Sequence, residues 1–169
     1  MIGNLTKIRT LQAATEPASG KPLLQSAALA WRNGESGCEV LLVTSRDTKR
    51  WVLPKGWREK GEPPYRAAER EAEEEAGIIG KTARRMLGEY AYDKRFPRGR
   101  VRRCLVAVYP VKVQRLLDQW PEISMRERRW MPLAQAAASV DEPGLAALIA
   151  AFKGDAGSEP GKAVMAGAA

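Results

Sequence analysis

The chain has 169 residues, of which 44% are apolar and 28% charged, a composition typical of one globular domain with a hydrophobic core. It lacks both the run of roughly 20 apolar residues that a membrane-spanning helix needs and an N-terminal secretory signal, so we expect a cytoplasmic protein without membrane contact. Histidine is absent, which excludes histidine-based triads and imidazole metal sites, and the net charge of +8 indicates an acidic partner.

The first part of the chain is predicted to form an arm and then strands. Residues 1–22 have no clear period and are interpreted as an N-terminal arm, and the domain is expected to cover residues 23–153. Apolar runs at residues 25–32 and 39–45 flank the turn-forming segment NGESG, a pattern that predicts a β-hairpin. Residues 51–53 form a further short extended segment.

A helix is predicted over Pro63–Ala76. Prolines suit its first turn, and glycine, here Gly77, is the preferred residue just past a helix end. Small side chains recur at intervals of three and four residues, as at Ala68 and Ala72, and form a narrow stripe with Tyr65. This stripe predicts a helix that lies close against a sheet.

The second half is predicted to contain three strands, two alanine-rich helices and a tail. The strands are expected at Met86–Tyr92, Val101–Val113 and Arg128–Met131, and the helices at Leu133–Val140 and Glu142–Lys153. Residues 154–169 lack a period and are expected to be disordered. Trp120 and Trp130 are assigned mainly to the core.

Acidic residues are concentrated on the predicted helix. Residues 56–77 contain seven Glu against four Lys or Arg, so this segment carries −3 and the remainder of the chain +11. Glu71, Glu74 and Glu75 are spaced to share an arc of about 100° on a helix. A solvated acidic face is the purely structural alternative, but three like charges repel one another, and a hard divalent cation would offset that repulsion. The pattern therefore favours a Mg²⁺ site, with Mn²⁺ as the other suitable ion.

The same segment resembles the signature of a known enzyme family. Gly56, then Glu62, then the run Arg70-Glu71-Ala72-Glu73-Glu74-Glu75-Ala76-Gly77-Ile78 match the Nudix box at every defined position. The box covers 23 of the 169 residues, and the predicted elements on both sides of it also suit that family. The resemblance implies an α/β fold, namely the Nudix αβα sandwich, in which a mixed β-sheet is flanked by helices.

The resemblance also implies roles for the residues of the box. Glu71 and Glu75 would bind metal, Glu74 would bind a further ion or act as general base, and the carbonyl of Gly56 would complete the ligand set. Arg70 would orient the carboxylates by ion pairing, and Glu62 would brace the loop against the helix. General chemistry agrees, because a metal-bound water has a lowered pKa and a neighbouring carboxylate can take its proton.

Basic residues on both sides of the box are candidates for substrate binding. These are Arg46, Arg50 and Lys55 before the helix and Lys94 and Arg95 in the basic loop after it, where six cations occur within ten residues. Such cations suit a small-molecule substrate with several adjacent phosphates. Solvent exposure is the alternative for individual arginines of the strand predicted from Val101, namely Arg102 and Arg103. Trp51 and Trp57 are interpreted as packing residues, with stacking on a base as the alternative.

Residues 120–136 resemble the diphosphoinositol polyphosphate phosphohydrolases, a group that is also active on diadenosine polyphosphates. The chain departs from the eukaryotic members of that group at Pro54-Lys55-Gly56-Trp57, where they carry a glycine triplet. The expected function is therefore cleavage of a phosphoanhydride bond in a substrate of either type. The alternatives are a pyrophosphohydrolase for nucleoside triphosphates or RNA 5′ ends, a non-catalytic Nudix-fold binding module, and a nucleic-acid-binding module with steeply salt-dependent affinity.

Overall fold

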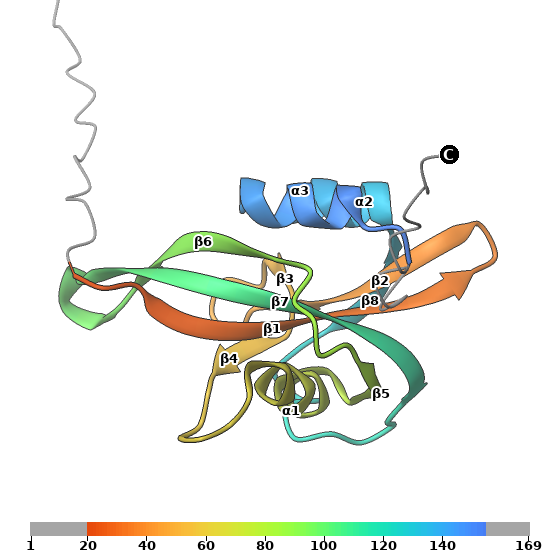
Figure 1. Ribbon diagram of the computed structural model, residues 1–169, viewed down its shortest axis with the longest axis horizontal. Coiled ribbons are helices and arrows are strands. Elements are labelled where there is room, and N and C mark those ends of the chain that lie inside the picture. The colour runs from red at the N-terminus through yellow and green to blue at the C-terminus, as the bar shows by residue number, and fades with distance from the viewer. Residues whose placement is uncertain (1–19, 155–169) are drawn as a thin grey trace, which may run out of the picture.

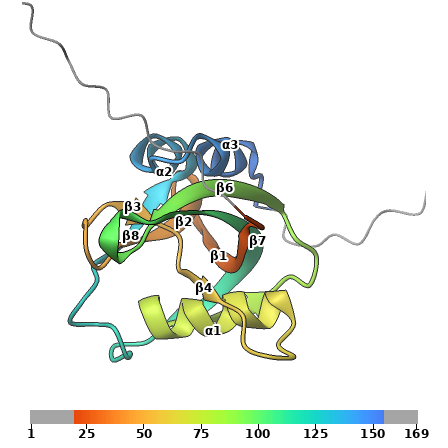
Figure 2. The ribbon, with the colours of Figure 1, turned by 90° about the vertical axis from the view of Figure 1, so that its left-hand side faces the viewer.

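A computed structural model describes residues 20–154, which form three layers (Figure 1). A β-sheet lies in the middle, with one helix on one face and two helices on the other, as the view at right angles also shows (Figure 2). The α/β sandwich and the mixed sheet predicted from the sequence are thus confirmed. Residues 1–19 and 155–169 lie outside the described residues, and with them most of the predicted arm and tail.

The sheet has eight strands and is mixed, because β1 and β7 are parallel whereas the other pairs are antiparallel. Its main path runs β3-β2-β1-β7-β5, and β4, β6 and β8 pair with β1, β7 and β2. The strands are β1 (Leu23–Gly34), β2 (Gly37–Thr44), β3 (Trp51–Val52), β4 (Lys55–Trp57), β5 (Ile78–Thr82), β6 (Gly88–Arg95), β7 (Val101–Leu116) and β8 (Arg128–Pro132).

Most strands agree with the sequence prediction. β1 and β2 form the predicted hairpin, with Gly34 opposite Gly37 at its turn. β6 begins two residues later than expected and extends to Arg95, and a 3₁₀ turn at Pro97–Gly99 then connects it to β7. The prediction missed β4, whose three residues pair with β1, and also β5. β5 is a five-residue strand that follows the helix directly and pairs with the end of β7 through a bulge. A strand this short is specified more by its partner than by its own residues.

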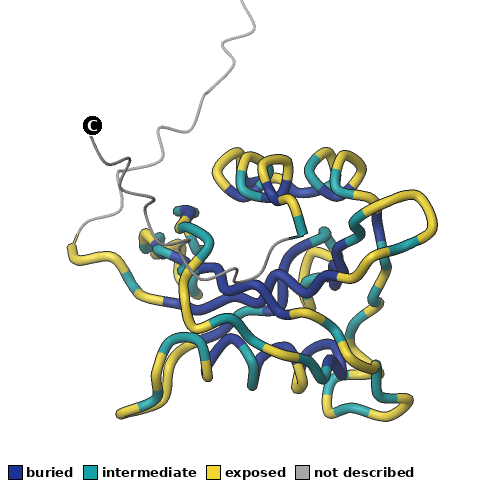
Figure 3. Tube along the Cα trace, turned by 45° about the vertical axis from the view of Figure 1, so that its right-hand side comes forward, coloured by how far each residue is buried: buried dark blue, intermediate teal, exposed yellow. Residues whose placement is uncertain are grey.

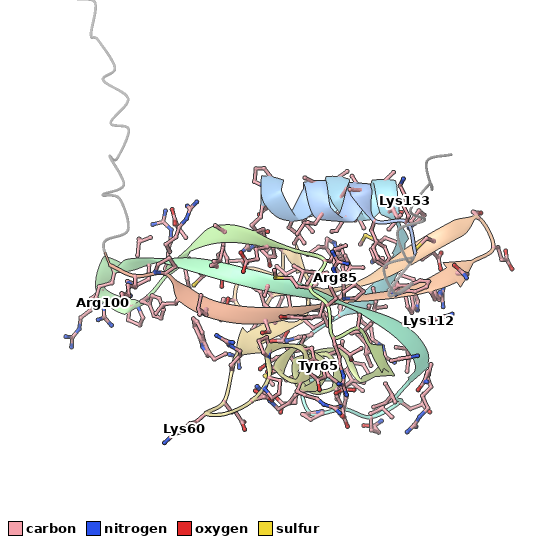
Figure 4. The ribbon with its side chains drawn as sticks, viewed as in Figure 1. Lys60, Tyr65, Arg85, Arg100, Lys112 and Lys153 are labelled. Carbon is pink, nitrogen blue, oxygen red and sulfur yellow. The ribbon has the colours of Figure 1, made fainter. Side chains whose placement is uncertain are left out.

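Helix α1 (Pro64–Ala76) packs on one face of the sheet through its small side chains. Ala68, Ala72 and Ala76 are buried, and the ring of Tyr65 packs beside them against the same hydrophobic cluster. Figure 4 shows Tyr65 between the helix and the sheet. Because alanine is small, the helix can lie close against the sheet along this stripe.

Helices α2 (Leu133–Ser139) and α3 (Pro143–Ala151) cover the other face. Ala136, Leu145 and Ile149 are fully buried in the larger hydrophobic cluster, which continues into the sheet (Figure 3). Trp130 is half-buried and packs against the second hydrophobic cluster, as expected. Trp120 is also half-buried but belongs to neither cluster, which corrects its assignment to the core. Each of the two has an arginine over its ring. Between residues 20 and 154, no helix is long and apolar enough to cross a membrane.

Candidate active site

Helix α1 directs two carboxylates toward a cleft at the edge of the sheet. Glu71 and Glu75 are one turn apart and are 9% and 8% exposed, and both line the cleft. The third acid of the predicted arc, Glu74, differs from them, because its side chain is 48% exposed and is not part of the cleft lining. Of the three predicted carboxylates, Glu71 and Glu75 therefore line the cleft, whereas Glu74 lies on the exposed side of the helix.

Gly56 lies against the carboxylate of Glu71. Strand β4 holds this glycine in place, because Gly56 pairs with Ser26 of β1. A Cβ atom added to Gly56 would clash with Oε1 of Glu71, so the carboxylate would have to move. Glycine lets the main chain approach the carboxylate without this displacement.

Arg70 connects the helix to the loop that precedes it. Its Nε and Nη2 atoms each donate to the Glu62 carboxylate at 3.0 Å, and Nη1 donates to Glu71 Oε1 at 2.7 Å. Glu74 lies 3.6 Å from the same Nη1 atom. The hydrogen bonds to Glu62 are the main cause of a raised Arg70 pKa. The geometry is that of the ion pairing and loop bracing that the box implies.

Arg126 holds Glu75 from the opposite side, an arrangement that the sequence analysis did not predict. Its side chain is 7% exposed and donates to Glu75 Oε1 at 2.5 Å, to Glu122 Oε2 at 2.7 Å and to the carbonyl of Thr44 at 3.0 Å. Glu122 also lines the cleft. Arg126 is one of several arginines between residues 126 and 129, and no local signal distinguishes the one that folds inward.

Burial shifts the pKa values of the charged groups in this region. It raises the pKa of Glu75 to about 7, against the opposing effects of Arg126 and Lys55, and it also raises the pKa of Glu71. Burial likewise lowers the pKa of Lys55, whose main-chain N–H donates to Glu75 Oε2 at 3.1 Å. Removing a carboxylate from water disfavours its charged form unless a cation is close by.

These residues fit a hard divalent cation. Glu71 and Glu75 are buried carboxylates, the first beside Gly56 and the second beside the main chain of Lys55. Carboxylate oxygens are ligands that Mg²⁺ and Mn²⁺ prefer. As the side chains stand, no group of three acidic or cysteine side chains within residues 20–154 is close enough together to hold an ion. A bound ion would therefore share its coordination between these two carboxylates, main-chain oxygen, water and substrate.

The cleft has a volume of about 650 Å³, and its lining contains every residue predicted to bind substrate. Those residues are Arg46, Arg50, Lys55, Lys94 and Arg95. We expected more cations than carboxylates in the lining, but it contains six of each. The cations are those five and Arg126, and the carboxylates belong to Asp47, Glu71, Glu75, Asp93, Glu122 and Glu142.

Trp57 lies at the mouth of the cleft and is 41% exposed, so it is not the packing residue that the sequence suggested. Lys94 lies over its ring, with the ammonium 5.3 Å from the ring centroid. By contrast, Trp51 packs against the hydrophobic core, as expected. Of the two candidates for stacking, only Trp57 offers an exposed ring beside the cleft.

Comparison with known proteins agrees with this geometry, since a family model described as the NUDIX domain matches residues 23–152. The chain belongs to the Nudix family. Nudix hydrolase 16, mitochondrial, of Arabidopsis thaliana is 35% identical over 119 residues, which cover 66% of this chain and 64% of that protein. Human diphosphoinositol polyphosphate phosphohydrolase 3-beta is 38% identical over 115 residues, which cover 66% of this chain and 65% of that protein.

The chain thus spans a little under two thirds of the length of these curated Nudix relatives. Among solved structures, an Ap4A hydrolase of C. elegans superposes with a TM-score of 0.56 at 18% identity, over 77% of this chain and 95% of that one. A Nudix hydrolase of Nitrosomonas europaea superposes with a TM-score of 0.59 at 20% identity, over 77% of this chain and 87% of that one. These likenesses show the Nudix fold. Because one relative is named mitochondrial, the expected cytoplasmic location stays a prediction.

Proposed function

We propose that this Nudix protein is a divalent-cation-dependent pyrophosphohydrolase that cleaves a phosphoanhydride bond in a diphosphoinositol polyphosphate or diadenosine polyphosphate type of substrate. The observation that carries the proposal is the pair of buried carboxylates, Glu71 and Glu75, which open onto the cleft beside the main chain of Gly56. Buried carboxylates are costly unless a cation compensates them. Basic side chains line the same cleft, which supports binding of a phosphate chain beside such a cation.

In this proposal Glu71, Glu75 and the carbonyl of Gly56 hold Mg²⁺ or Mn²⁺, and Glu74 binds a further ion or accepts a proton. The bound cation would lower the pKa of a water molecule and neutralise charge on the phosphoryl oxygens. A histidine-free chain suits this chemistry, because carboxylates supply both the ligands and the proton acceptor.

The protein's own side chains orient the carboxylates and the substrate. Arg70 holds Glu71 through Nη1, and Arg126 holds Glu75 through Nη2, so neither carboxylate is free to rotate away from the cleft. Among the basic residues of the lining, Arg46 and Arg95 are exposed at the rim and would bind phosphate oxygens.

A substrate panel tests the proposal. Diphosphoinositol polyphosphates, diadenosine polyphosphates, nucleotide sugars, nucleoside triphosphates and 5′-triphosphorylated RNA would be incubated with the purified full chain and Mg²⁺. We expect hydrolysis of at least one of the first two classes. Preferential release of pyrophosphate from the triphosphates would support the alternative pyrophosphohydrolase instead. Binding without turnover of any substrate would indicate a non-catalytic module.

Substitutions in the metal site give a second test. We expect Glu71→Gln and Glu75→Gln to weaken Mn²⁺ binding about a hundredfold, because each loses a charged ligand. Glu74→Gln is expected to lower kcat with the fold retained. Calorimetric titration with Mn²⁺, circular dichroism and steady-state rates would measure these effects, with the exposed Glu73→Gln as the matched control on the same helix. Unchanged rates in all three variants would refute the assignment.

A further inference from the structure

A buried carboxylate lies in the cleft on the side opposite helix α1, and the chemistry proposed above does not use it. Glu142 precedes helix α3 and is 7% exposed, yet it is part of the cleft lining. Its Oε1 accepts a hydrogen bond from Nη1 of Arg50 at 2.6 Å. Its Oε2 is buried and has no hydrogen-bond partner among residues 20–154. A hydrocarbon side chain could pack at this position without leaving a buried acceptor unpaired.

Glu142 reduces the ability of Arg50 and Lys55 to bind phosphate. The guanidinium of Arg50 is already paired, and Glu142 is also one of the charges that act on the buried ammonium of Lys55. A carboxylate repels a phosphate oxygen that comes within a few ångströms, and this repulsion is strong in a site with little water. The part of the cleft beside Arg50 is therefore less favourable for phosphate than its arginine suggests.

Other cations of the cleft are similarly engaged. Arg126 is shared between Glu75 and Glu122, and Lys94 lies over the rings of Trp57 and Phe96. With six carboxylates against six cations in the lining, the cleft does not provide a uniformly positive surface for many phosphates at once. Its capacity for phosphate is concentrated near the metal site and at the exposed arginines of the rim.

We propose that Glu142 is a specificity-determining residue, which keeps phosphate groups out of the part of the cleft that it lines. This inference rests on the proposed function and narrows it. The preferred substrate carries its phosphates in one linear chain, and the rest of the molecule bears hydroxyl or amino groups in place of phosphates. A dinucleoside polyphosphate meets this description, whereas an inositol ring with a phosphate on nearly every carbon does not.

Trp57 supports the same substrate class. Its exposed ring borders the cleft and also a second hollow, which is lined by Leu24 and residues 57–62. An exposed aromatic ring beside a phosphate site can stack on a nucleobase, and an inositol polyphosphate has no aromatic group that would use it.

A binding experiment tests the role of Glu142 without turnover. Inositol hexakisphosphate, which is dense in phosphate and has no anhydride bond, would be titrated into the full-length wild type, Glu142→Gln and Asp141→Asn in one metal-free buffer. Gln keeps an oxygen that can accept from Arg50, removes the charge and replaces Oε2 with an amide NH2 group. We expect Glu142→Gln to bind this probe at least about tenfold more tightly than the wild type.

Asp141→Asn is the matched control, because Asp141 is also near Arg50, at 3.6 Å, but its side chain is 70% exposed. Screening by water should keep its effect within about twofold. Equal or weaker binding by Glu142→Gln, or no detectable binding by that variant, would overturn the proposal. So would an equal gain in Asp141→Asn.

A turnover experiment separates this inference from the proposed function. With Mg²⁺, wild-type kcat/KM is expected to be at least about tenfold higher for diadenosine tetraphosphate than for a diphosphoinositol pentakisphosphate, and Glu142→Gln should reduce that ratio. A wild type that prefers the inositol substrate would overturn the inference and leave the proposed hydrolase intact. A wild type that hydrolyses no anhydride would contradict the proposed function, while the titration still decides the role of Glu142. The wild-type comparison requires no variant to fold.

Discussion

At the scale of single residues, the site depends on charged groups that are buried and paired. Glu75 is held by Arg126, Glu71 by Arg70 and Arg50 by Glu142. The buried pairs contribute most when both partners are present, because one charge left alone in the interior loses hydration without compensation. The exposed pair of Arg66 and Glu69 on the same helix has no such requirement.

This difference predicts the effect of Arg126→Met. The side chains of Arg126 and Glu75 are 7% and 11% exposed, so the variant leaves a buried carboxylate unpaired and should lose about 3–5 kcal/mol of unfolding free energy. Urea unfolding monitored by tryptophan fluorescence would measure this loss. Arg66→Met is the control and should leave the midpoint unchanged. A similar midpoint for both variants would show that Arg126 does not stabilise Glu75.

The position of Gly56 beside Glu71 leads us to expect that a substitution there weakens metal binding. In Gly56→Ala the new Cβ would meet Glu71 Oε1, so the carboxylate must move and Mn²⁺ affinity should fall by about 10–100-fold. Gly34→Ala is a matched control, since its Cβ would also meet a glutamate, at 2.6 Å, but Glu39 is at the end of the β1–β2 hairpin, remote from the cleft. Calorimetry on both variants measures the effect, and equal affinities would contradict this view of Gly56.

At the scale of elements, the segment from β7 to β8 completes the end of helix α1. The last turn of a helix leaves carbonyl groups without helical partners, and here side chains and main chain from this segment supply donors. The indole of Trp120 donates to the carbonyl of Glu75, the N–H of Glu122 to that of Glu74, and Arg128 to that of Ala76. The cleft residues Glu122 and Arg126 are thereby fixed relative to the proposed metal ligands.

Gly77 ends the helix in the left-handed conformation, with φ of 62°, directly beneath this segment. An alanine there incurs a backbone penalty of about 1–2 kcal/mol, and its Cβ would also lie 3.1 Å from atoms of Trp120. Gly99→Ala is the control, because φ is 73° and no atom lies near its Cβ. We expect Gly77→Ala to lose more unfolding free energy than Gly99→Ala in urea titrations. Equal losses of unfolding free energy would show that the segment between β7 and β8 moves aside without destabilising the protein.

At the scale of the whole molecule, the positive charge lies mainly outside the cleft. The chain carries +8, but the residues that line the cleft balance one another, six against six. Part of the surplus is at the end of the β6–β7 hairpin, where Figure 4 shows Arg100 at one extreme of the molecule. We therefore expect the positive surface to raise the rate at which a polyanion reaches the cleft more than the strength with which the cleft binds it.

The prediction at this scale concerns ionic strength. Raising KCl from 50 to 300 mM should lower kcat/KM for a polyphosphate substrate severalfold, because attraction at a distance is screened, while kcat should change little. Steady-state rates at fixed free Mg²⁺ would measure both constants. A parallel fall in kcat and kcat/KM would show that salt acts on a step after substrate binding, and it would contradict this prediction. Arg98→Gln together with Arg100→Gln should weaken the salt dependence of kcat/KM.

Features that depend on local periodicity and spacing could be predicted from the sequence. The 3.6-residue repeat placed helix α1 and its alanine stripe correctly, and alternating turn and strand residues gave the β1–β2 hairpin. The box residues indicated the Nudix family because their spacing is contiguous in the chain. The five basic residues predicted to bind substrate all line the cleft.

The pairing of charged side chains could not be predicted from the sequence, because the partners are far apart in the chain. Arg126 is 51 residues from Glu75, and Glu142 is 92 residues from Arg50, so no local pattern could pair them. Strand β5 likewise depends on its partner β7, which is distant in sequence. The basic residues on both sides of the box predicted an excess of cations at the substrate site, but folding brought as many carboxylates as cations into the cleft. The physical reason is that pairing and burial depend on distances in space, which the sheet sets by joining segments far apart in the chain.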